Sequence, residues 1–160
     1  MKKDIHTAIL CLTHRCNLNC VYCFEQKDGT HELSFDMACR CVDEIIKTHC
    51  ITTGSAVNLN FFGGEPLLKF ELIKDIYNYV QSHYSIYDVS FFASTNGTLL
   101  TDEMKVWFSD RKEKFCLGLS LDGDRDTQNY NRSNSFDLID IKYFAENWPK
   151  QFFKLTLSVP

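Results

Sequence analysis

Three cysteines near the N-terminus are spaced to hold a metal cluster. Cys16, Cys20 and Cys23 lie within eight residues, with three and then two residues between them. Such a loop can turn three thiolates toward one face of a cubane iron–sulfur cluster, whose irons favour sulfur ligands. No fourth cysteine follows at short range, so one iron is left without a protein ligand and can bind a small molecule. The pattern favours a catalytic cluster over one that only carries electrons.

Two other interpretations of the three thiols stay open at this point. A zinc site could take His14 or His31 as its fourth ligand, because mixed cysteine and histidine sets are common around zinc. The thiols could also be unrelated, since a free cysteine often serves as a small apolar residue in a core.

Composition limits the class of protein. The 160 residues include 44% hydrophobic and 24% charged residues, which is typical of one soluble domain with a real core. The net charge is −4 and no basic cluster occurs, so a nucleic-acid partner is not expected. The apolar stretch Thr7–Thr13 is too short for a membrane span or a signal peptide. Five further cysteines show no metal spacing, and a reducing, cytoplasmic location without a membrane partner is expected.

Strand-like and helix-like segments alternate along the chain, which predicts α/β units around a parallel sheet. Serine or threonine residues at Ser34, Thr101 and Ser135 are expected to cap three of the helices. The expected strands are Ile5–Thr13, Ala56–Phe62, Val89–Thr95, Phe115–Leu121 and Phe152–Val159. The expected helices are Ser34–His49, a helix marked by apolar residues from Phe70 to Tyr84, a short one from Thr101 to about Asp110, and Ser135 to about Asn147.

Polar motifs follow three of these strands, where function gathers in barrels of this kind. The run Gly63-Gly64-Glu65-Pro66 offers close backbone approach and a carboxylate, although Gly-Gly also marks ordinary tight turns. Ser94-Thr95-Asn96-Gly97 is either a site element or a common Asn-Gly turn. In the fourth strand, Cys116, Gly118 and Ser120 form a small, polar row that predicts a lumen-facing side, unless the strand is simply half-exposed.

The motifs together resemble those of the radical S-adenosylmethionine (SAM) enzymes. The resemblance rests on the cysteine motif with Tyr22 before its last cysteine, on Gly-Gly-Glu-Pro and on Thr-Asn-Gly. It implies that SAM chelates the open iron of a [4Fe-4S] cluster and is cleaved by one electron to methionine and a 5′-deoxyadenosyl radical, which abstracts a hydrogen atom. The fold implied is a partial (βα) barrel of six strands, so about five units are present and the sixth is expected to be missing. Residues 1–160 are then expected to be a radical SAM core domain, truncated at its C-terminal end.

The resemblance also implies roles for single residues in SAM binding. Gly63 and Gly64 would line the methionyl part and Glu65 would hold its amino group. Asn96 would lie near the SAM and substrate pocket, and Tyr22 would give backbone contacts to the adenine or simply pack. The cofactor-binding residues implied for the fourth strand and beyond are Ser120 and Arg132 on the SAM carboxylate, unless Arg132 is a solvated surface residue, and Asp122 near the ribose or supporting its loop.

The run Ser120-Leu121-Asp122-Gly123, with Arg132 twelve residues beyond the serine, is similar to that of the peptide and protein maturases among these enzymes, such as the anaerobic sulfatase-maturating enzymes. This implies an oxidoreductase of the maturase type that acts on a peptide or protein side chain and takes electrons from a donor such as flavodoxin or ferredoxin. Many maturases carry a cysteine-rich C-terminal domain, and residues 1–160 are not expected to include it. A radical SAM enzyme for a small molecule, a glycyl-radical activase, a core that binds SAM without turnover and a zinc-binding interaction module therefore remain alternatives.

Overall fold

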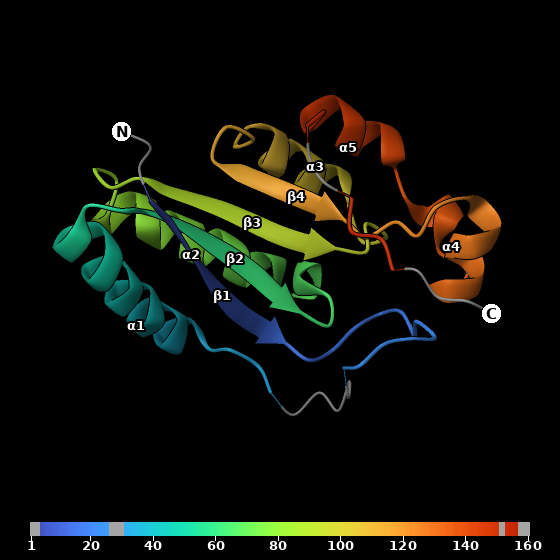
Figure 1. The fold of residues 1–160 in the computed structure, drawn as a ribbon, viewed down its shortest axis with the longest axis horizontal. Coiled ribbons are helices and arrows are strands. Elements are labelled where there is room, and N and C mark those ends of the chain that lie inside the picture. Colours follow the sequence, from blue (N-terminus) through green and yellow to red (C-terminus); the bar gives the residue numbers. More distant parts are fainter. Residues whose placement is uncertain (1–3, 26–30, 151–152, 157–160) are drawn as a thin grey trace.

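A parallel sheet forms the centre of the computed structural model, which describes residues 4–25, 31–150 and 153–156 (Figure 1). The described residues form four strands in the order β1-β2-β3-β4, and helices join each strand to the next. This arrangement confirms the predicted α/β fold and the partial barrel. The strands are β1 (Ile5–Thr13), β2 (Ala56–Gly63), β3 (Val89–Thr95) and β4 (Phe115–Leu119). The connecting helices are α1 (Phe35–Ile46), α2 (Phe70–His83) and α3 (Asp102–Ser109).

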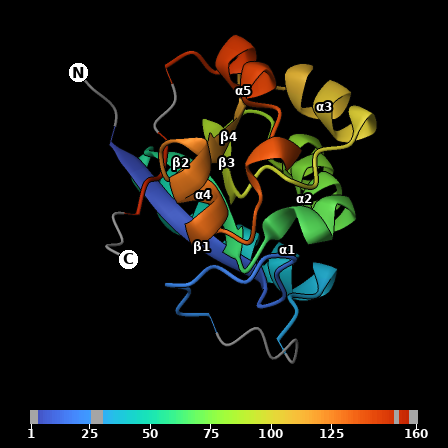
Figure 2. The ribbon, with the colours of Figure 1, turned by 90° about the vertical axis from the view of Figure 1, so that its right-hand side faces the viewer.

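The register brings the ends of all four strands to one edge of the sheet. Thr13 at the end of β1 pairs with Gly63 at the end of β2, and Thr95 at the end of β3 pairs with Leu119 at the end of β4. Parallel strands share their carboxyl edge, so the loops that follow them lie together. Figure 2 looks onto this edge, where the cysteine loop and the helix α4 (Arg125–Asn131) lie in front of the strands.

The helices cover one face of the sheet, and the core lies between them and the strands (Figure 2). Alternate strand residues point into this core. Phe61, Phe91 and Phe115 stack there across β2, β3 and β4, with ring centroids 5.7–6.2 Å apart. This stack explains part of the chain's high aromatic content, because large rings fill the space between the sheet and its helices. The opposite face of the sheet, expected to line a lumen, carries polar or small residues such as Asn60, Ser94 and Gly118 together with the rings of Phe62 and Phe92.

Two predicted helix caps are confirmed. The Ser34 hydroxyl accepts a hydrogen bond from the Met37 N–H at the start of α1, and the Thr101 hydroxyl accepts one from Met104 at the start of α3. The buried residues of α1 are Ala38, Val42 and Ile46. After Ile46 the chain continues as a π-helical turn, η1 (Lys47–Ile51).

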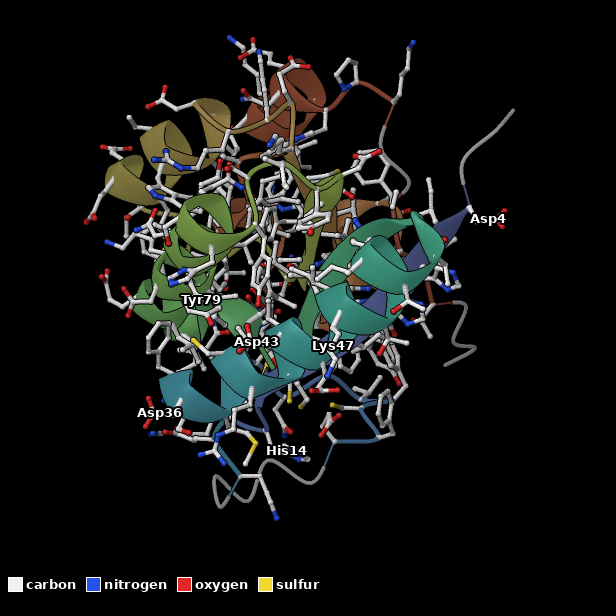
Figure 3. All side chains as sticks on the ribbon, turned by 90° about the vertical axis from the view of Figure 1, so that its left-hand side faces the viewer. Asp4, His14, Asp36, Asp43, Lys47 and Tyr79 are labelled. Carbon is white, nitrogen blue, oxygen red and sulfur yellow. The ribbon has the colours of Figure 1, made fainter. Side chains whose placement is uncertain are left out.

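On the outer surface, one carboxylate joins α1 to α2. Asp43 accepts hydrogen bonds from the hydroxyls of Tyr79 (2.9 Å) and Tyr84 (2.7 Å) (Figure 3). These contacts add polar links to the packing of the two helices over the sheet.

The prediction that a helix starts at Ser135 is wrong. The chain instead forms a 3-10 turn, η3 (Phe136–Leu138), and then α5 (Ile141–Asn147), which is capped by Asp140. The Ser135 hydroxyl is used elsewhere, because it accepts a hydrogen bond from the Gln128 side chain. Helix α4 was not predicted from the sequence, since it buries polar residues, Gln128 and Asn131, and shows no apolar period.

The fifth strand, expected over Phe152–Val159, lies partly outside the described residues. Within 153–156, Lys154 forms a parallel bridge with Ser120: its N–H donates to the Leu119 carbonyl, and its own carbonyl accepts from Leu121. The segment therefore lies beside the end of β4, on the side where a further strand would extend the sheet. No helix in the described part of the chain is both long and apolar enough to cross a membrane.

Candidate functional site

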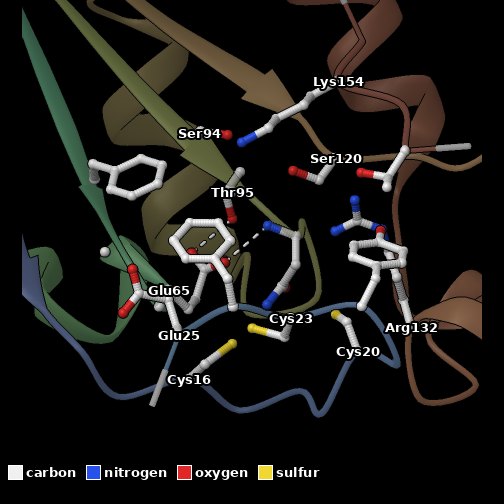
Figure 4. Close-up of a pocket in the computed structure, with 17 residues that line it drawn as sticks. Cys16, Cys20, Cys23, Glu25, Glu65, Ser94, Thr95, Ser120, Arg132 and Lys154 are labelled. Carbon is white, nitrogen blue, oxygen red and sulfur yellow. Dashed lines mark hydrogen bonds between the residues drawn. The ribbon is translucent and has the colours of Figure 1, made fainter. Parts of the chain in front are cut away.

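The cysteine loop that follows β1 brings its three thiols to one cavity. Cys16, Cys20 and Cys23 line a cavity of about 260 Å³ at the carboxyl edge of the sheet (Figure 4). None of the eight cysteines, all of which lie within the described residues, forms a disulfide. Most of the site residues predicted from the sequence line the same cavity, namely Tyr22, Gly63, Gly64, Glu65, Asn96, Ser120 and Arg132. Asp122 does not line it.

Neighbouring elements hold the first half of the cysteine loop. The Asn17 side chain accepts a hydrogen bond from the Asn96 amide (2.9 Å) and donates one to the Thr98 hydroxyl (2.8 Å). The side-chain oxygen of Asn96, Oδ1, in turn accepts hydrogen bonds from the Thr98 N–H and hydroxyl. The Asn-Gly turn after β3 therefore has a clear positional role, since it fixes the loop beside Cys16.

Helix α4 and the residues after it hold the second half of the loop. The Val21 N–H donates to the Asn131 carbonyl (2.9 Å), and the Asn19 N–H donates to the Ser133 hydroxyl (2.9 Å). Ser133 and Asn134 both have φ of 54°, a left-handed conformation that lets the chain turn sharply there. Residues 79 to 114 positions away in sequence thus give the cysteine loop its shape.

The two glycines after β2 are required by the backbone of the cysteine loop. A Cβ at Gly63 would lie 2.1 Å from the Thr13 carbonyl oxygen, and one at Gly64 would lie 2.4 Å from that of Arg15. The Gly64 N–H donates to Thr13 and the Glu65 N–H donates to Arg15. The Gly-Gly motif predicts that these glycines admit a ligand. In the structure they first admit the neighbouring loop, and they also line the cavity.

Glu65 is a buried carboxylate with three hydrogen-bond donors. Its Oε1 accepts from the Leu67 N–H (3.0 Å) and the Thr95 hydroxyl (2.8 Å), and its Oε2 accepts from the Asn96 N–H (2.8 Å). Only 1% of the residue is exposed. Burial raises the pKa of Glu65 to about 7, although the three donors oppose that change. A carboxylate has about four acceptor positions, so one remains for a ligand in the cavity.

Asp122 and Arg132 form a bidentate ion pair beside the cavity. Arg132 Nε and Nη2 donate to the two Asp122 oxygens at 2.9 and 3.0 Å. The Tyr22 hydroxyl and the Thr156 N–H also donate to Asp122. Burial alone would raise the pKa of Asp122, but the bonds from Arg132 and Tyr22 hold it below its ordinary value. With its oxygens engaged by protein groups, Asp122 supports its loop and the placement of Arg132.

Arg132 keeps donors for the cavity. Its Nη1 makes no hydrogen bond within the described part of the chain, and the residue lines the cavity with 7% of its surface exposed. The guanidinium also lies over the Tyr22 ring, 5.4 Å from its centroid. A fixed guanidinium with free N–H groups suits a carboxylate ligand.

Lys154 is a cavity residue that the sequence analysis did not single out. Its ammonium lies 5.5 Å from the centroid of the Phe62 ring, and its side chain is directed toward Ser94 (Figure 4). A signal was present in the alternation of the last segment. Lys154 and Thr156 alternate along this segment and both line the cavity, whereas Phe153 and Leu155 do not.

The two histidines considered as zinc ligands do not line the thiol cavity. His14 and His31 border a different hollow together with Cys11 and Glu32, and His14 lies 3.3 Å from the Glu25 carboxylate. Among the residues that the structure describes, no group of three or more histidine, cysteine or acidic side chains, the three thiols included, is placed so that it could hold a single metal ion. Three sulfur donors from one loop, with the rest of the cavity open to a further ligand, fit a cluster with an open iron better than they fit closed zinc coordination.

Comparison with known proteins agrees with the geometry. Residues 10–139 match the family described as the Radical SAM superfamily. The uncharacterized protein MJ0907 of Methanocaldococcus jannaschii is 32% identical over 115 residues, which make up 72% of this chain and 38% of that protein. The cysteine-type anaerobic sulfatase-maturating enzyme of Clostridium perfringens is 29% identical over 124 residues, 74% of this chain and 33% of the enzyme.

The fold resembles a solved structure described as native anSMEcpe with bound AdoMet and Cp18Cys peptide. The TM-score is 0.74 at 23% identity, and the match covers 95% of this chain and 42% of that one. The chain thus spans less than half the length of each of these three proteins.

Proposed function

The chain belongs to the radical SAM superfamily, and on that premise we propose that it is a SAM-binding catalytic core whose cluster is held by Cys16, Cys20 and Cys23. One observation carries the proposal: the three thiols line the same cavity as Glu65 and the guanidinium of Arg132. When bound, a [4Fe-4S] cluster there supplies the electron that cleaves SAM and so provides a radical for hydrogen abstraction.

The protein's own groups then bind and orient SAM. Arg132 Nη1, fixed from behind by Asp122, donates to the SAM carboxylate, and Ser120 lies beside it. Glu65 uses its remaining acceptor position for the amino group, with Gly63 and Gly64 along the methionyl part. Tyr22 offers backbone groups to the adenine, while its hydroxyl remains on Asp122.

We propose a peptide or protein substrate. The relatives include an anaerobic sulfatase-maturating enzyme, and the solved structure that the fold resembles contains a peptide. Residues 1–160 then form one core domain. Eight cysteines without a disulfide, and a cluster with an open iron, suit a reducing cytoplasm with a small electron donor such as a flavodoxin or ferredoxin.

Reconstitution without oxygen tests the cluster. The chain should bind about four irons through the three thiols, and replacing Cys16, Cys20 or Cys23 by alanine should abolish the cluster. Cys39→Ala is the matched control, because Cys39 lies on α1, away from the cavity, and should leave the iron content unchanged. Equal loss of iron in the Cys16 and Cys39 variants would contradict the ligand assignment, as would stoichiometric zinc in place of iron.

SAM binding and cleavage are measured on the same preparations. Arg132→Met should weaken SAM binding roughly tenfold or more, since the charged Nη1 donor left over from the pair with Asp122 is lost, and it should retain iron. Reduced protein should form 5′-deoxyadenosine from SAM. A chain with a full cluster that neither binds nor cleaves SAM would overturn the proposed function.

A further inference from the structure

A second cavity opens on the lumen face of the sheet and joins the thiol cavity. Its volume is about 420 Å³, and it shares Phe62, Ser94 and Lys154 with the cavity of the cysteines. The rest of its lining comes from Ile9 on β1, Asn60 on β2, Phe92 on β3, Gly118 on β4 and Phe153. A ligand in this space would therefore lie next to whatever occupies the thiol cavity.

Aromatic rings form the apolar part of this second cavity. Phe92 lies across the backbone of Gly118, where a Cβ would come within 2.3 Å of its ring. Because Gly118 has no side chain, the Phe92 ring can lie directly against the backbone of β4. Together with Phe62, it presents flat apolar surface, which is typical of a small-ligand site.

One hydrogen-bond acceptor and one cation complete the lining of the second cavity. The Asn60 side-chain oxygen is buried and accepts no hydrogen bond from any described residue. A buried acceptor left without a donor costs stability, so a ligand N–H or O–H would relieve that cost. Lys154 brings an ammonium held over the Phe62 ring, and in the described part of the chain no carboxylate pairs with it.

We propose that this second cavity is the substrate subsite of the radical SAM core and that Lys154 selects a substrate that carries a carboxylate. The substrate class is an amino-acid unit, free or at the end of a peptide. Its amide N–H donates to Asn60, its apolar body lies on Phe62 and Phe92, and its carboxylate meets Lys154. The inference rests on the proposed function, because it takes the neighbouring cavity as the SAM site.

Matched probes test the subsite without iron or SAM. N-acetylphenylalanine and N-acetylphenylalaninamide differ only in the carboxylate, and their binding to the apo chain is measured by ligand-observed NMR titration. We expect the carboxylate probe to bind about fivefold more tightly. The factor is modest because Lys154 is accessible to solvent, where one ion pair is worth up to about 1 kcal/mol.

Variants assign that preference to residues. Lys154→Met should abolish it, whereas Lys142→Met should retain it, since Lys142 is an exposed residue of α5 outside the cavity. Asn60→Leu should weaken both probes alike, because both carry the same acetylated N–H. If the wild type binds the two probes equally, or if Lys154→Met keeps the preference, the proposal is wrong.

SAM binding separates this inference from the proposed function. Lys154 borders both cavities, and in reconstituted protein Lys154→Met should weaken SAM binding by less than the roughly fivefold lost for the carboxylate probe. A loss of SAM affinity as large as the loss for the carboxylate probe would place Lys154 in the SAM site and overturn the subsite. Failure of the wild type to bind iron or SAM would instead refute the proposed function, whatever the probes do.

Discussion

Glu65→Gln should change how the stability of the apo protein depends on pH. The buried Glu65 carboxyl has a pKa of about 7 against an ordinary value of 4.5. Between these values the folded state holds a proton that the unfolded state has released, so stability falls as pH rises through this window. The full difference in pKa corresponds to about 3 kcal/mol, of which about 2.5 kcal/mol develops between pH 5 and pH 8.

Glutamine has nearly the same shape but does not titrate. Its amide fits the donors of Leu67, Thr95 and Asn96 less well than a carboxylate does, but that misfit is a constant cost at every pH. The free energy of unfolding of the variant, relative to wild type, should therefore rise by about 2.5 kcal/mol from pH 5 to pH 8. The pH dependence contributed by all other groups cancels in the comparison, because both proteins contain them.

Urea unfolding of the iron-free, reduced protein, followed by the fluorescence of its two tryptophans, measures the difference at each pH. Glu113→Gln is the matched control: Glu113 is exposed in the turn before β4, and its substitution should give a difference that does not vary with pH. If the Glu65→Gln difference is also constant from pH 5 to pH 8, Glu65 titrates as an exposed acid, and the buried network drawn around it is refuted.

Three further substitutions probe the frame of the site. Asp122→Asn should lower the free energy of unfolding by about 3 kcal/mol or more, since it leaves the buried Arg132 without its charge partner; Asp75→Asn on the exposed side of α2 is the control in the same urea assay. Tyr22→Phe should cost about 1 kcal/mol in that assay, and a cost equal to that of Asp122→Asn would contradict the view that Arg132 is the main partner. Gly64→Ala should cost about 1–3 kcal/mol and reduce iron uptake, because its Cβ collides with the Arg15 carbonyl; wild-type iron content and stability would contradict the close approach.

The sequence predicted the frame of the fold well because the strands of this sheet have strong local signals. The strands β1 and β3 begin and end where the pattern placed them, and the caps Ser34 and Thr101 act as expected. In a parallel sheet with strands in chain order, these elements alone bring the strand ends together. Motifs separated by dozens of residues could therefore be assigned to the carboxyl edge of the sheet from the sequence alone.

Local patterns could not show which partner each polar residue takes. Arg132 was expected at a SAM carboxylate, yet two of its nitrogens bind Asp122, ten residues earlier. Glycines at Gly63 and Gly64 indicated close approach, but the sequence does not say that the approaching group is the backbone of Thr13 and Arg15. Helix α4 was missed for a related reason, since a helix that buries polar side chains at a rim has no apolar period to find.

The position of the cysteines depends on contacts from several distant elements. The loop makes hydrogen bonds through Asn17 to the turn after β3, and through Asn19 and Val21 to the end of α4. The hydroxyl of Tyr22, which belongs to the same loop, donates a hydrogen bond to Asp122 in the segment after β4. A loop without regular structure would otherwise lose much conformational entropy on binding a ligand. Because these contacts form when the barrel folds, that entropy cost falls on folding, and the three thiols already face one cavity before any iron arrives.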